Sequence, residues 1–560
     1  MSKEQIILGI NGYSRRVHDA SACIVVNGNL VAMAEEERFT RRKKAFGEVP
    51  HNAIAFCLDR AGITVDQVDS IAIGWNFDKV FGNIGAKPPT RDELIDLYLP
   101  SDRFKYSKRP ELEMVSHHLA HAASAYYLSG FPESLVLVID GQGETQSTSV
   151  FTAKGKGVSL IREFGVTDSL GFFYEAVSEY VGLSRLDVGK TMGLASYGSP
   201  IYEFGLFRLV EGGYSVDLIP PAQREMDLQQ EVTRLWRDYL EGKFGPANRV
   251  DLAYDSTRAR FKREVSFGDT YKNVTASAQK ALEDVVRHLI TLYAAEYQMK
   301  NLCIAGGVGL NCSMNGVIAR DGIVADFFVP PFSNDAGVSV GAALYLSDQK
   351  PTTRLESASL GPEFSNDAIV TTLKSLGIDY RSVDDIGSYV AKLLAEDKIV
   401  DWFQGKMEAG PRALGNRSIL GNPTNRATHH RLNEIKNREP WRPLAPSFLA
   451  EDLANYMQDS SDSPFMLRAF LTRPNKVSEI PAAVHIDGTS RAQTVTERTS
   501  PLYYRLIKDF KHISGIPAVM NTSFNLEYEP IVCSPHDAIR TFYSSSADYL
   551  AIGDALISKR

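Results

Sequence analysis

Val115-Ser-His-His-Leu-Ala-His-Ala-Ala-Ser-Ala-Tyr-Tyr127 is rich in helix-forming residues and lacks Pro and Gly, so it predicts a helix that Gly130 ends. On a helix, His117 and His121 leave the same face one turn apart. Two neutral imidazoles at that spacing can hold one cation. The alternative is that both histidines are ordinary polar residues of a half-buried helix.

The apolar run that follows predicts a buried strand. Ser134-Leu-Val-Leu-Val-Ile139 ends in Asp140-Gly141. A carboxylate at the carboxyl end of a strand, beside a glycine, lies where open α/β sheets bind ligands. The two histidines and Asp140 are therefore candidate metal ligands. Asp335 follows another strand-like run, residues 327–331, and is a second carboxylate in such a place, although it could also be the N-cap of the helix after it.

Length and composition narrow the classes of protein. A chain of 560 residues is too long to fold around one hydrophobic core, and this length suggests roughly three or four domains. A net charge of −7 gives no electrostatic support for nucleic-acid binding. The five cysteines form no Cys-x-x-Cys pair, which fits a reducing compartment. Because no signal-peptide pattern and no apolar run near the roughly 18 residues of a membrane span occur, we expect a soluble cytoplasmic protein.

A pattern of three strands occurs twice. Residues 6–34, with an Asn27-Gly28 turn, predict an antiparallel meander whose first strand closes with Asn11-Gly12. The pattern returns at residues 135–162, with Asp140-Gly141 in the corresponding place. Such duplication is typical of the actin/sugar-kinase-like (ASKHA) nucleotide-binding fold, in which two glycine turns hold phosphate oxygens. Either turn alone could be structural.

Two later glycine-rich stretches, residues 189–198 and 302–311, also favour close approach of a nucleotide. The candidates for nucleotide binding in the first part of the chain are Asn11, Gly12, Gly141, Lys190, Gly193, Gly306, Gly307 and Asn311. The highly charged residues 35–44 predict a solvated loop for most of their members.

At residues 351–363 the sequence becomes polar and the regular spacing of apolar residues stops. This change predicts a linker between a domain of residues 1–350 and a second α/β domain of residues 364–560. The second domain carries basic residues placed singly among glycines, a pattern that suits a phosphate-rich small molecule. The segments are residues 405–418, 435–443, 490–491 and 519–525.

Six motifs spread over nearly the whole chain are His117-x-x-x-His121, Val-Ile-Asp140-Gly, Ala305-Gly-Gly-Val-Gly-Leu-Asn, Asp335-Ala-Gly, Gly410-Pro-Arg-Ala-Leu-Gly-Asn-Arg-Ser and Asn521-Thr-Ser-Phe-Asn. Together they resemble the bacterial O-carbamoyltransferase family, which includes the nodulation-factor, cephalosporin and tobramycin carbamoyltransferases. The resemblance implies a duplicated ASKHA domain, similar to the tRNA threonylcarbamoyl-transfer enzyme. It also implies a following threonylcarbamoyl-adenylate-synthase-like (YrdC-like) α/β domain.

The resemblance implies a reaction in two steps. The second domain would make carbamoyl adenylate from carbamoyl phosphate and ATP with Mg2+. The residues that match the family's elements for this step are Lys436, Arg438, Arg491, Ser523 and Asn525. The basic-residue pattern adds Arg412 and Arg417 as nucleotide contacts, and the charged residues 35–44 add Lys43 or Lys44.

Transfer would follow in the first domain, at a bound metal that polarises the carbamoyl oxygen. The implied ligands are His117, His121, Asp140 and Asp335. Fe2+ is the first expectation for the metal, and Mn2+ and Zn2+ stay open. His18 matches a histidine near the acceptor and could deprotonate the attacking hydroxyl. The alternative is a turn histidine bonded to Asp19 or Ser21.

The expected partner is a small-molecule hydroxyl acceptor, a secondary metabolite or a sugar, with neither nucleic acid nor membrane; a homodimer stays open. Two other classes share the duplicated fold. A sugar kinase would bind Mg2+ through carboxylates rather than histidines. A non-transferring, chaperone-like ATPase would need neither the histidine pair nor the basic second domain. Formation of AMP and pyrophosphate rather than ADP distinguishes the carbamoyltransferase from both.

Overall fold

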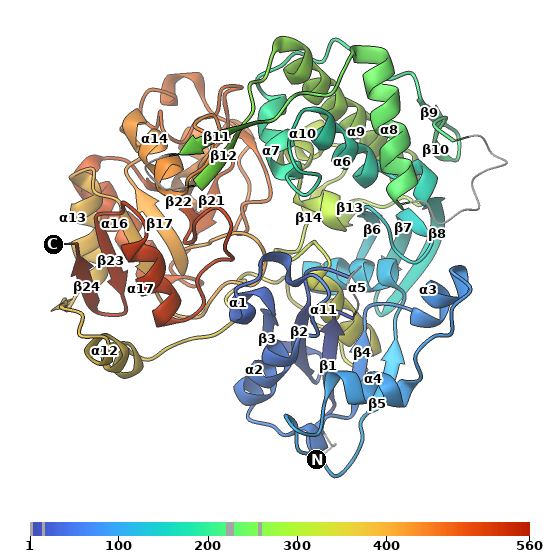
Figure 1. Ribbon diagram of the computed structural model, residues 1–560, viewed down its shortest axis with the longest axis horizontal. Helices are drawn as coiled ribbons and strands as arrows, with labels where there is room; N and C mark the ends of the chain where they lie inside the picture. The colour runs from blue at the N-terminus through green and yellow to red at the C-terminus, as the bar shows by residue number, and fades with distance from the viewer. Residues whose placement is uncertain (1–3, 14–16, 220–228, 256–259, 560) are drawn as a thin grey trace. The chain divides into compact units, whose positions relative to one another are not determined.

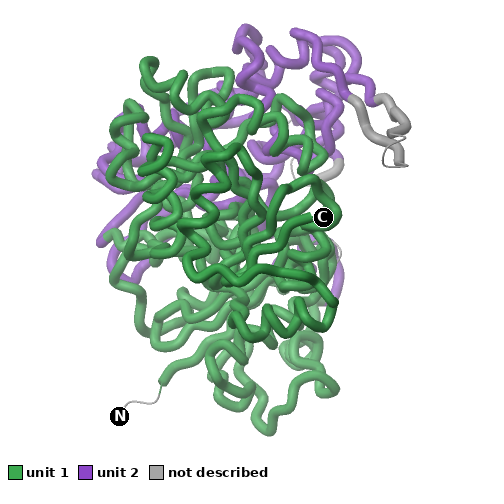
Figure 2. The backbone as a smooth tube through the Cα atoms, turned by 90° about the vertical axis from the view of Figure 1, so that its left-hand side faces the viewer, with its two compact units in different colours: residues 1–78, 88–131, 328–560 green, residues 79–87, 132–327 purple. Residues whose placement is uncertain are grey.

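The computed structural model describes residues 4–13, 17–219, 229–255 and 260–559 (Figure 1). Contacts within the chain divide it into two compact units (Figure 2). Unit 1 consists of residues 1–78, 88–131 and 328–560, and unit 2 of residues 79–87 and 132–327. Unit 1 therefore contains both the beginning and the end of the chain.

The first sheet of unit 1 is a meander extended by two parallel strands. Its antiparallel strands are β1 (Ile6–Asn11), β2 (Ser21–Val26) and β3 (Asn29–Glu35). On the other side of β1 lie β4 (Ser70–Ile73) and β5 (Glu111–Met114), both parallel to their neighbours. The strand order is β3-β2-β1-β4-β5, and the predicted meander is confirmed.

The sheet of unit 2 repeats this topology. Its antiparallel strands are β6 (Glu133–Ile139), β7 (Gln146–Lys154) and β8 (Gly157–Gly165). They are followed in the sheet by β13 (Asn301–Ala305), parallel to β6, and by β14 (Asp326–Phe328). The order β14-β13-β6-β7-β8 corresponds strand by strand to β5-β4-β1-β2-β3. The duplication predicted from the sequence is thus confirmed in the strand order.

Helices complete unit 2, which also contains an insertion of strands and a helix. The packed helices are α6 (Leu170–Tyr180), α7 (Val188–Ala195), α9 (Asp269–Glu296) and α10 (Cys312–Asp321). The insertion contains β9 (Phe207–Val210), β10 (Gly213–Val216), α8 (Gln229–Phe244), β11 (Asp251–Asp255) and β12 (Arg260–Glu264). Across the described residues, every helix lacks the combination of length and apolar character that a membrane crossing needs.

The last part of unit 1 is built on an eight-stranded mixed sheet. Its order is β15-β24-β23-β16-β17-β22-β18-β21. The strands are β15 (Arg381–Ser382), β16 (Val400–Phe403), β17 (Arg417–Gly421), β18 (Ala445–Leu449), β21 (Gln493–Val495), β22 (Ala518–Ser523), β23 (Tyr549–Ile552) and β24 (Ala555–Ser558). The accompanying helices include α12 (Asn366–Ser375), α13 (Ile386–Ala395), α14 (Arg426–Ile435), α16 (Pro501–Ser514) and α17 (Pro535–Tyr543). The molecule is therefore a mixed α/β protein.

Helix α11 (Ala336–Leu346) packs on the first sheet and against α5 (His117–Ser129). Glycines allow both contacts. A Cβ added at Gly9 of β1 would overlap the carbonyl oxygen of Ser339, and one at Gly341 would overlap that of Ala120. Because backbone meets backbone here, the positions of α5 and α11 are fixed without intervening side chains.

Gly341→Ala should lower the free energy of unfolding by at least ~2 kcal/mol, because the new methyl group must push α5 and α11 apart. Urea unfolding measures the change. Gly242→Ala in α8 is the matched control, since within the described structure an added Cβ there has no neighbour within 4 Å. The control should leave stability unchanged or raise it by about 0.5–1 kcal/mol. Equal midpoints for both variants would show that the helix contact tolerates a methyl group.

Candidate active site

Two histidines of α5 and one aspartate before α11 bring three ligand-type atoms together in unit 1. The Nε2 atoms of His117 and His121 lie 3.2 Å apart, and each lies 3.7 Å from Oδ1 of Asp335. Both imidazoles are fully buried and Asp335 is 5% exposed. In the part of the chain that the structure describes, these three residues belong to a group that could hold a metal ion.

The surroundings of His117 suit a metal ligand. Its Nδ1 lies 3.1 Å from the carbonyl oxygen of Gly74. A carbonyl only accepts, so Nδ1 carries the proton of the neutral ring, and Nε2, which lies beside His121 and Asp335, carries the lone pair that a metal would need. Trp75 stacks on the same ring with centroids 3.8 Å apart. Two imidazole nitrogens and a carboxylate form a donor set that Fe2+, Mn2+ and Zn2+ accept. The three side chains therefore fit a divalent metal.

Asp335 occupies the N-cap position of α11. Within the described residues its carboxylate makes no capping hydrogen bond to that helix. Its oxygens instead lie near His117, His121 and His18. The alternative role that the sequence allows, a simple helix cap, is therefore not observed.

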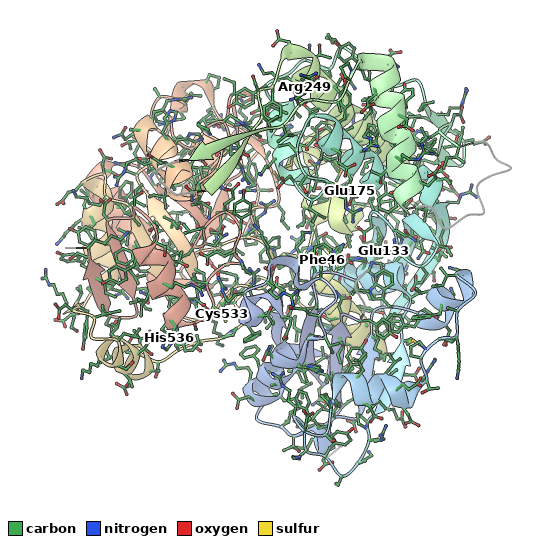
Figure 3. All side chains as sticks on the ribbon, viewed as in Figure 1. Phe46, Glu133, Glu175, Arg249, Cys533 and His536 are labelled. Atoms are coloured by element: carbon green, nitrogen blue, oxygen red, sulfur yellow. The ribbon has the colours of Figure 1, made fainter. Side chains whose placement is uncertain are left out.

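His18 lies in the turn after β1, beside Asp335. Its Nδ1 is 3.0 Å from Oδ2 of Asp19 and 3.8 Å from Oδ2 of Asp335. Phe46, labelled in Figure 3, meets the ring edge-on with centroids 5.4 Å apart. Burial lowers the pKa of His18, but Asp335 and Asp19 outweigh burial and raise it to about 9. The contact with Asp19 is the one that the turn-histidine alternative predicts.

Asn11 and Gly12 support this turn. The Asn11 amide donates to the carbonyl oxygens of His18, at 3.1 Å, and Asp19, at 3.0 Å, and its Oδ1 accepts from Nε1 of Trp75 at 3.0 Å. Gly12 takes a φ of +128°, which L side chains rarely adopt. These contacts give both residues a structural role, and their predicted contact with a nucleotide stays a prediction.

Asp140 and the predicted glycines meet at the strand ends of unit 2. Oδ1 of Asp140, directly after β6, accepts from the backbone N–H of Gly141 at 2.8 Å and of Gly307 at 3.3 Å. Gly306, after β13, has a φ of +87°, and an added Cβ would overlap the carbonyl oxygen of Ile139. The carboxyl ends of two parallel strands thus bring these residues together. The role of Asp140 as a metal ligand stays a prediction.

The other candidates in unit 2 have contacts within the protein. Asn311 caps α10: its Oδ1 accepts from the N–H of Met314 at 3.0 Å, and its Nδ2 donates to Gln279 at 2.9 Å. Lys190 forms an ion pair with Asp187 at 3.4 Å. Gly193 is buried in α7. Binding of a nucleotide by Asn311, Lys190 and Gly193 stays a prediction.

Lys436 and Arg438 lie after α14, beside the end of β22. Lys436 is 4% exposed. Its ammonium donates to the backbone oxygen of Asn525 at 2.8 Å, to Oδ1 of Asn525 at 3.0 Å and to Oγ of Ser523 at 3.2 Å. Nε of Arg438 donates to Oδ1 of Asn433 at 2.6 Å. The structure therefore brings together four residues that the sequence predicts from two distant motifs.

Like charges surround these two cations. Burial lowers the pKa of Lys436 well below its ordinary value, and Arg438, Lys43 and Arg442 lower it further. The pKa of Arg438 is also well below its ordinary value, because burial lowers it and Arg442 and Arg491 lower it further. A bound polyanion would relieve this repulsion. Arg442 belongs to the same basic motif but is not among the residues predicted for this site.

Arg417 and Arg412 differ in their surroundings. Arg417 is fully buried, and its Nη atoms donate to the carbonyl oxygens of Gln404 at 2.8 Å and Pro362 at 3.1 Å. Its guanidinium carbon lies 3.7 Å from the ring centroid of Phe403. This geometry gives Arg417 a structural role and lends the predicted nucleotide contact no support. Arg412 is half-buried in the turn before β17, and its predicted contact stays a prediction.

Residues 35–44, hereafter the charged segment, do not form the solvated loop predicted for most of them. Glu35, Glu36 and Arg38 are 5%, 2% and 3% exposed. Arg38 forms ion pairs with Glu35 at 3.2 Å and Glu37 at 2.8 Å, and donates to the carbonyl oxygen of Gly410 at 2.8 Å. The prediction is wrong for these residues because Glu35 and Glu37 neutralise Arg38, and the carboxylate of Glu36 accepts from the backbone N–H of Ala53 at 2.8 Å.

Known proteins resemble the chain over most of its length. A family model described as Carbamoyltransferase N-terminus matches residues 6–87 and 91–344, and one described as Carbamoyltransferase C-terminus matches residues 391–559. Nodulation protein NolNO of Sinorhizobium fredii is 36% identical over 97% of this chain and 79% of its own length. An uncharacterised protein of Synechocystis is 35% identical over 99% of this chain and 96% of its own length. Nodulation protein U of Bradyrhizobium diazoefficiens is 27% identical over 91% of this chain and 90% of its own length.

His117→Ala and His121→Ala should each lower the amount of bound divalent metal by about tenfold or more, because each removes one of few donors. Elemental analysis of the purified variants measures the metal, and circular dichroism checks the fold. His118→Ala is the control: His118 is buried on the same helix, with its ring centroid 6.4 Å from that of His121. We expect the control to retain its metal and all three variants to fold. A full complement of metal in His121→Ala would contradict the site, and unfolding of both variants would make the metal structural.

Proposed function

The chain belongs to the carbamoyltransferase family, and we propose that it catalyses ATP-dependent O-carbamoyl transfer to a hydroxyl group of a small molecule. Carbamoyl phosphate and ATP would first give carbamoyl adenylate, and the acceptor hydroxyl would then displace AMP. The observation that carries the proposal is the cluster of Lys436, Arg438, Arg442 and Arg491, in which like charges oppose one another and the buried Lys436 is held by Asn525 and Ser523; a polyanion would stabilise such a cluster.

In the first step, water hydrolyses carbamoyl phosphate to phosphate and carbamate, and the carbamate oxygen then attacks the α-phosphorus of ATP while pyrophosphate leaves. Both reactants are anions, so fixed cations must hold them together. Asn525 and Ser523 hold the ammonium of Lys436 in place. Arg438 is fixed by Asn433, which orients its planar guanidinium for phosphate oxygens.

In the second step, the reacting atoms are the carbamoyl carbon and the acceptor oxygen. His117, His121 and Asp335, with Asp140 as a predicted fourth ligand, would hold a divalent metal that polarises the carbamoyl oxygen when bound. His18 is the candidate for taking the hydroxyl proton as the new C–O bond forms, since it lies beside Asp335. Its neighbouring carboxylates favour the protonated ring and would therefore stabilise the imidazolium that forms when the proton is taken.

The proposal also divides the chain into two domains and a linker. We assign residues 1–350 to an ASKHA-like transfer domain, residues 351–363 to a linker and residues 364–560 to a threonylcarbamoyl-adenylate-synthase-like domain. The repeated strand order of the two five-stranded sheets supports the first assignment, and the cation cluster beside the eight-stranded sheet supports the second. A small-molecule acceptor, a cytoplasmic location and a homodimer stay predictions.

Lys436→Ala and Arg438→Ala should each abolish formation of AMP and pyrophosphate from ATP and carbamoyl phosphate, because each removes a cation that would face phosphate. Transfer from synthetic carbamoyl adenylate should survive. Chromatographic detection of the nucleotides measures the first step, and mass spectrometry of an acceptor panel measures the second. Lys374→Ala, at an exposed position of α12, is the control for the charge change. Release of ADP by the unaltered protein would instead favour a kinase or a chaperone-like ATPase, and loss of both steps in Lys436→Ala would mean that one site serves both.

His18→Ala should slow transfer from carbamoyl adenylate by roughly a hundredfold or more, the usual effect of losing a general base. Formation of AMP and pyrophosphate with carbamoyl phosphate and the amount of bound metal should not change. Single-turnover transfer and elemental analysis measure these quantities. Transfer at nearly the normal rate would remove His18 from the mechanism.

A further inference from the structure

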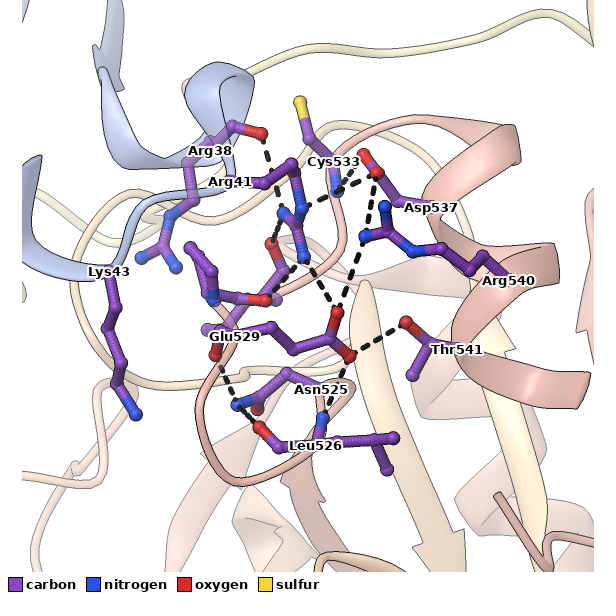
Figure 4. Close-up of polar contacts among 12 residues, drawn as sticks. Arg38, Arg41, Lys43, Asn525, Leu526, Glu529, Cys533, Asp537, Arg540 and Thr541 are labelled. Carbon is purple, nitrogen blue, oxygen red and sulfur yellow. Dashed lines mark hydrogen bonds and ion pairs between the residues drawn. The ribbon is translucent and has the colours of Figure 1, made fainter. Parts of the chain in front are cut away.

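The charged segment links two regions of unit 1 that lie far apart in the sequence. At one end, the carbonyl oxygen of Lys44 accepts from the N–H of Asp19 at 2.7 Å, in the turn that carries His18. Next to α1 (Glu37–Thr40), Arg41 adopts a left-handed conformation with a φ of 59°. Arg41 points from the charged segment toward residues 525–531, the loop after β22 (Figure 4).

The guanidinium of Arg41 binds both backbone and carboxylates of this region. It donates to the carbonyl oxygens of Ile531 at 2.6 Å and Pro530 at 2.7 Å. It also lies 3.5 Å from Oε2 of Glu529 and 3.4 Å from Oδ1 of Asp537. The side chain of Arg41 is only 15% exposed. A planar group with several N–H donors can bind both carbonyl oxygens while its charge lies beside both carboxylates, which a lysine cannot do.

Hydrogen bonds continue from Glu529 to the cation cluster. Oε1 of Glu529 accepts from the N–H of Leu526 at 2.9 Å, and its backbone oxygen accepts from Nδ2 of Asn525 at 2.8 Å. Oδ1 of Asn525 in turn accepts from the ammonium of Lys436 at 3.0 Å. Arg41 is therefore connected to Lys436 through Glu529 and Asn525, first by an ion pair and then by hydrogen bonds.

A second contact supports the same connection. Nζ of Lys43 donates to the carbonyl oxygen of Glu527 at 3.1 Å, in the middle of the loop. A single contact of this kind between the charged segment and the loop could result from ordinary packing. Here both Arg41 and Lys43 bind the loop that holds Asn525, the residue that fixes Lys436.

We propose that Arg41 is a positioning residue for carbamoyl-adenylate formation: it holds residues 525–531 in the conformation in which Asn525 orients the ammonium of Lys436. The inference rests on the proposed function and assigns a role in the first step to a residue from the first 50 of the chain. Without Arg41, the carbonyl groups of Pro530 and Ile531 lose their donors, and the loop gains alternative conformations.

The matched control comes from the same group of charges. Arg540 of α17 lies 3.4 Å from Oε2 of Glu529 and 3.4 Å from Oδ1 of Asp537, the two carboxylates that Arg41 also approaches. Its side chain is 55% exposed. Arg41→Gln and Arg540→Gln therefore remove the same charge from the same carboxylates. Arg41→Gln additionally removes the donors to the two loop carbonyls.

Arg41→Gln should lower kcat/KM for pyrophosphate release from ATP and carbamoyl phosphate by about tenfold or more, and Arg540→Gln by less than about twofold. Transfer from synthetic carbamoyl adenylate should stay within about twofold for both variants. Hydrogen–deuterium exchange should accelerate at residues 525–531 in Arg41→Gln alone.

Equal rates and equal exchange in the two variants would overturn the proposal, since the effect would then be one of charge only. A parallel loss of both steps in Arg41→Gln would also overturn it, because that pattern is expected of general destabilisation. If the unaltered protein releases no pyrophosphate, the proposed function fails. Even in that case, the hydrogen–deuterium exchange rates of residues 525–531 in the two variants decide whether Arg41 holds the loop.

Discussion

The backbone contact between α11 and its neighbours is the constraint on which the candidate active site depends. Gly9 of β1 and Gly341 of α11 leave no space for a side chain, so the helix lies directly on the sheet and on α5. Helix α5 carries His117 and His121, and Asp335 immediately precedes α11. The separation of the imidazole nitrogens from the carboxylate is therefore set by two rigid helices rather than by loop conformations, as precise ligand geometry requires.

The cation cluster beside the eight-stranded sheet is held in a different way. Lys436 is surrounded by oxygens of Asn525 and Ser523, at the end of a strand and in the loop that follows. Hydrogen bonds, rather than backbone contact, fix these groups. Such a site is easier to rearrange, and it depends on each donor and acceptor being matched. The candidate metal ligands are thus fixed by backbone packing, and the cation cluster by hydrogen bonds.

Local patterns predicted much of this arrangement. The four-residue spacing of His117 and His121, the Asn27-Gly28 turn and the repeated three-strand pattern each depend on neighbours in the sequence, and the structure contains all of them. Burial of the charged segment could not be predicted in that way, because Arg38 and Glu35 bind Gly410, more than 370 residues later. Likewise, the basic pattern around Arg417 suggested a ligand, whereas its actual acceptors are carbonyl groups whose positions only the folded chain defines.

The charged segment also bears on how the polypeptide holds together. Arg38 and Arg41 bind groups that follow residue 400, so the connection between the beginning and end of unit 1 does not rest on the covalent linker alone. If the chain were produced as two fragments divided near residue 350, Arg41 on one fragment would be separated from its ion-pair partners, Glu529 and Asp537, on the other. Those charges are a driving force for reassembly in trans. Because ion pairs that become exposed are screened by salt, the affinity of the two fragments would fall as ionic strength rises.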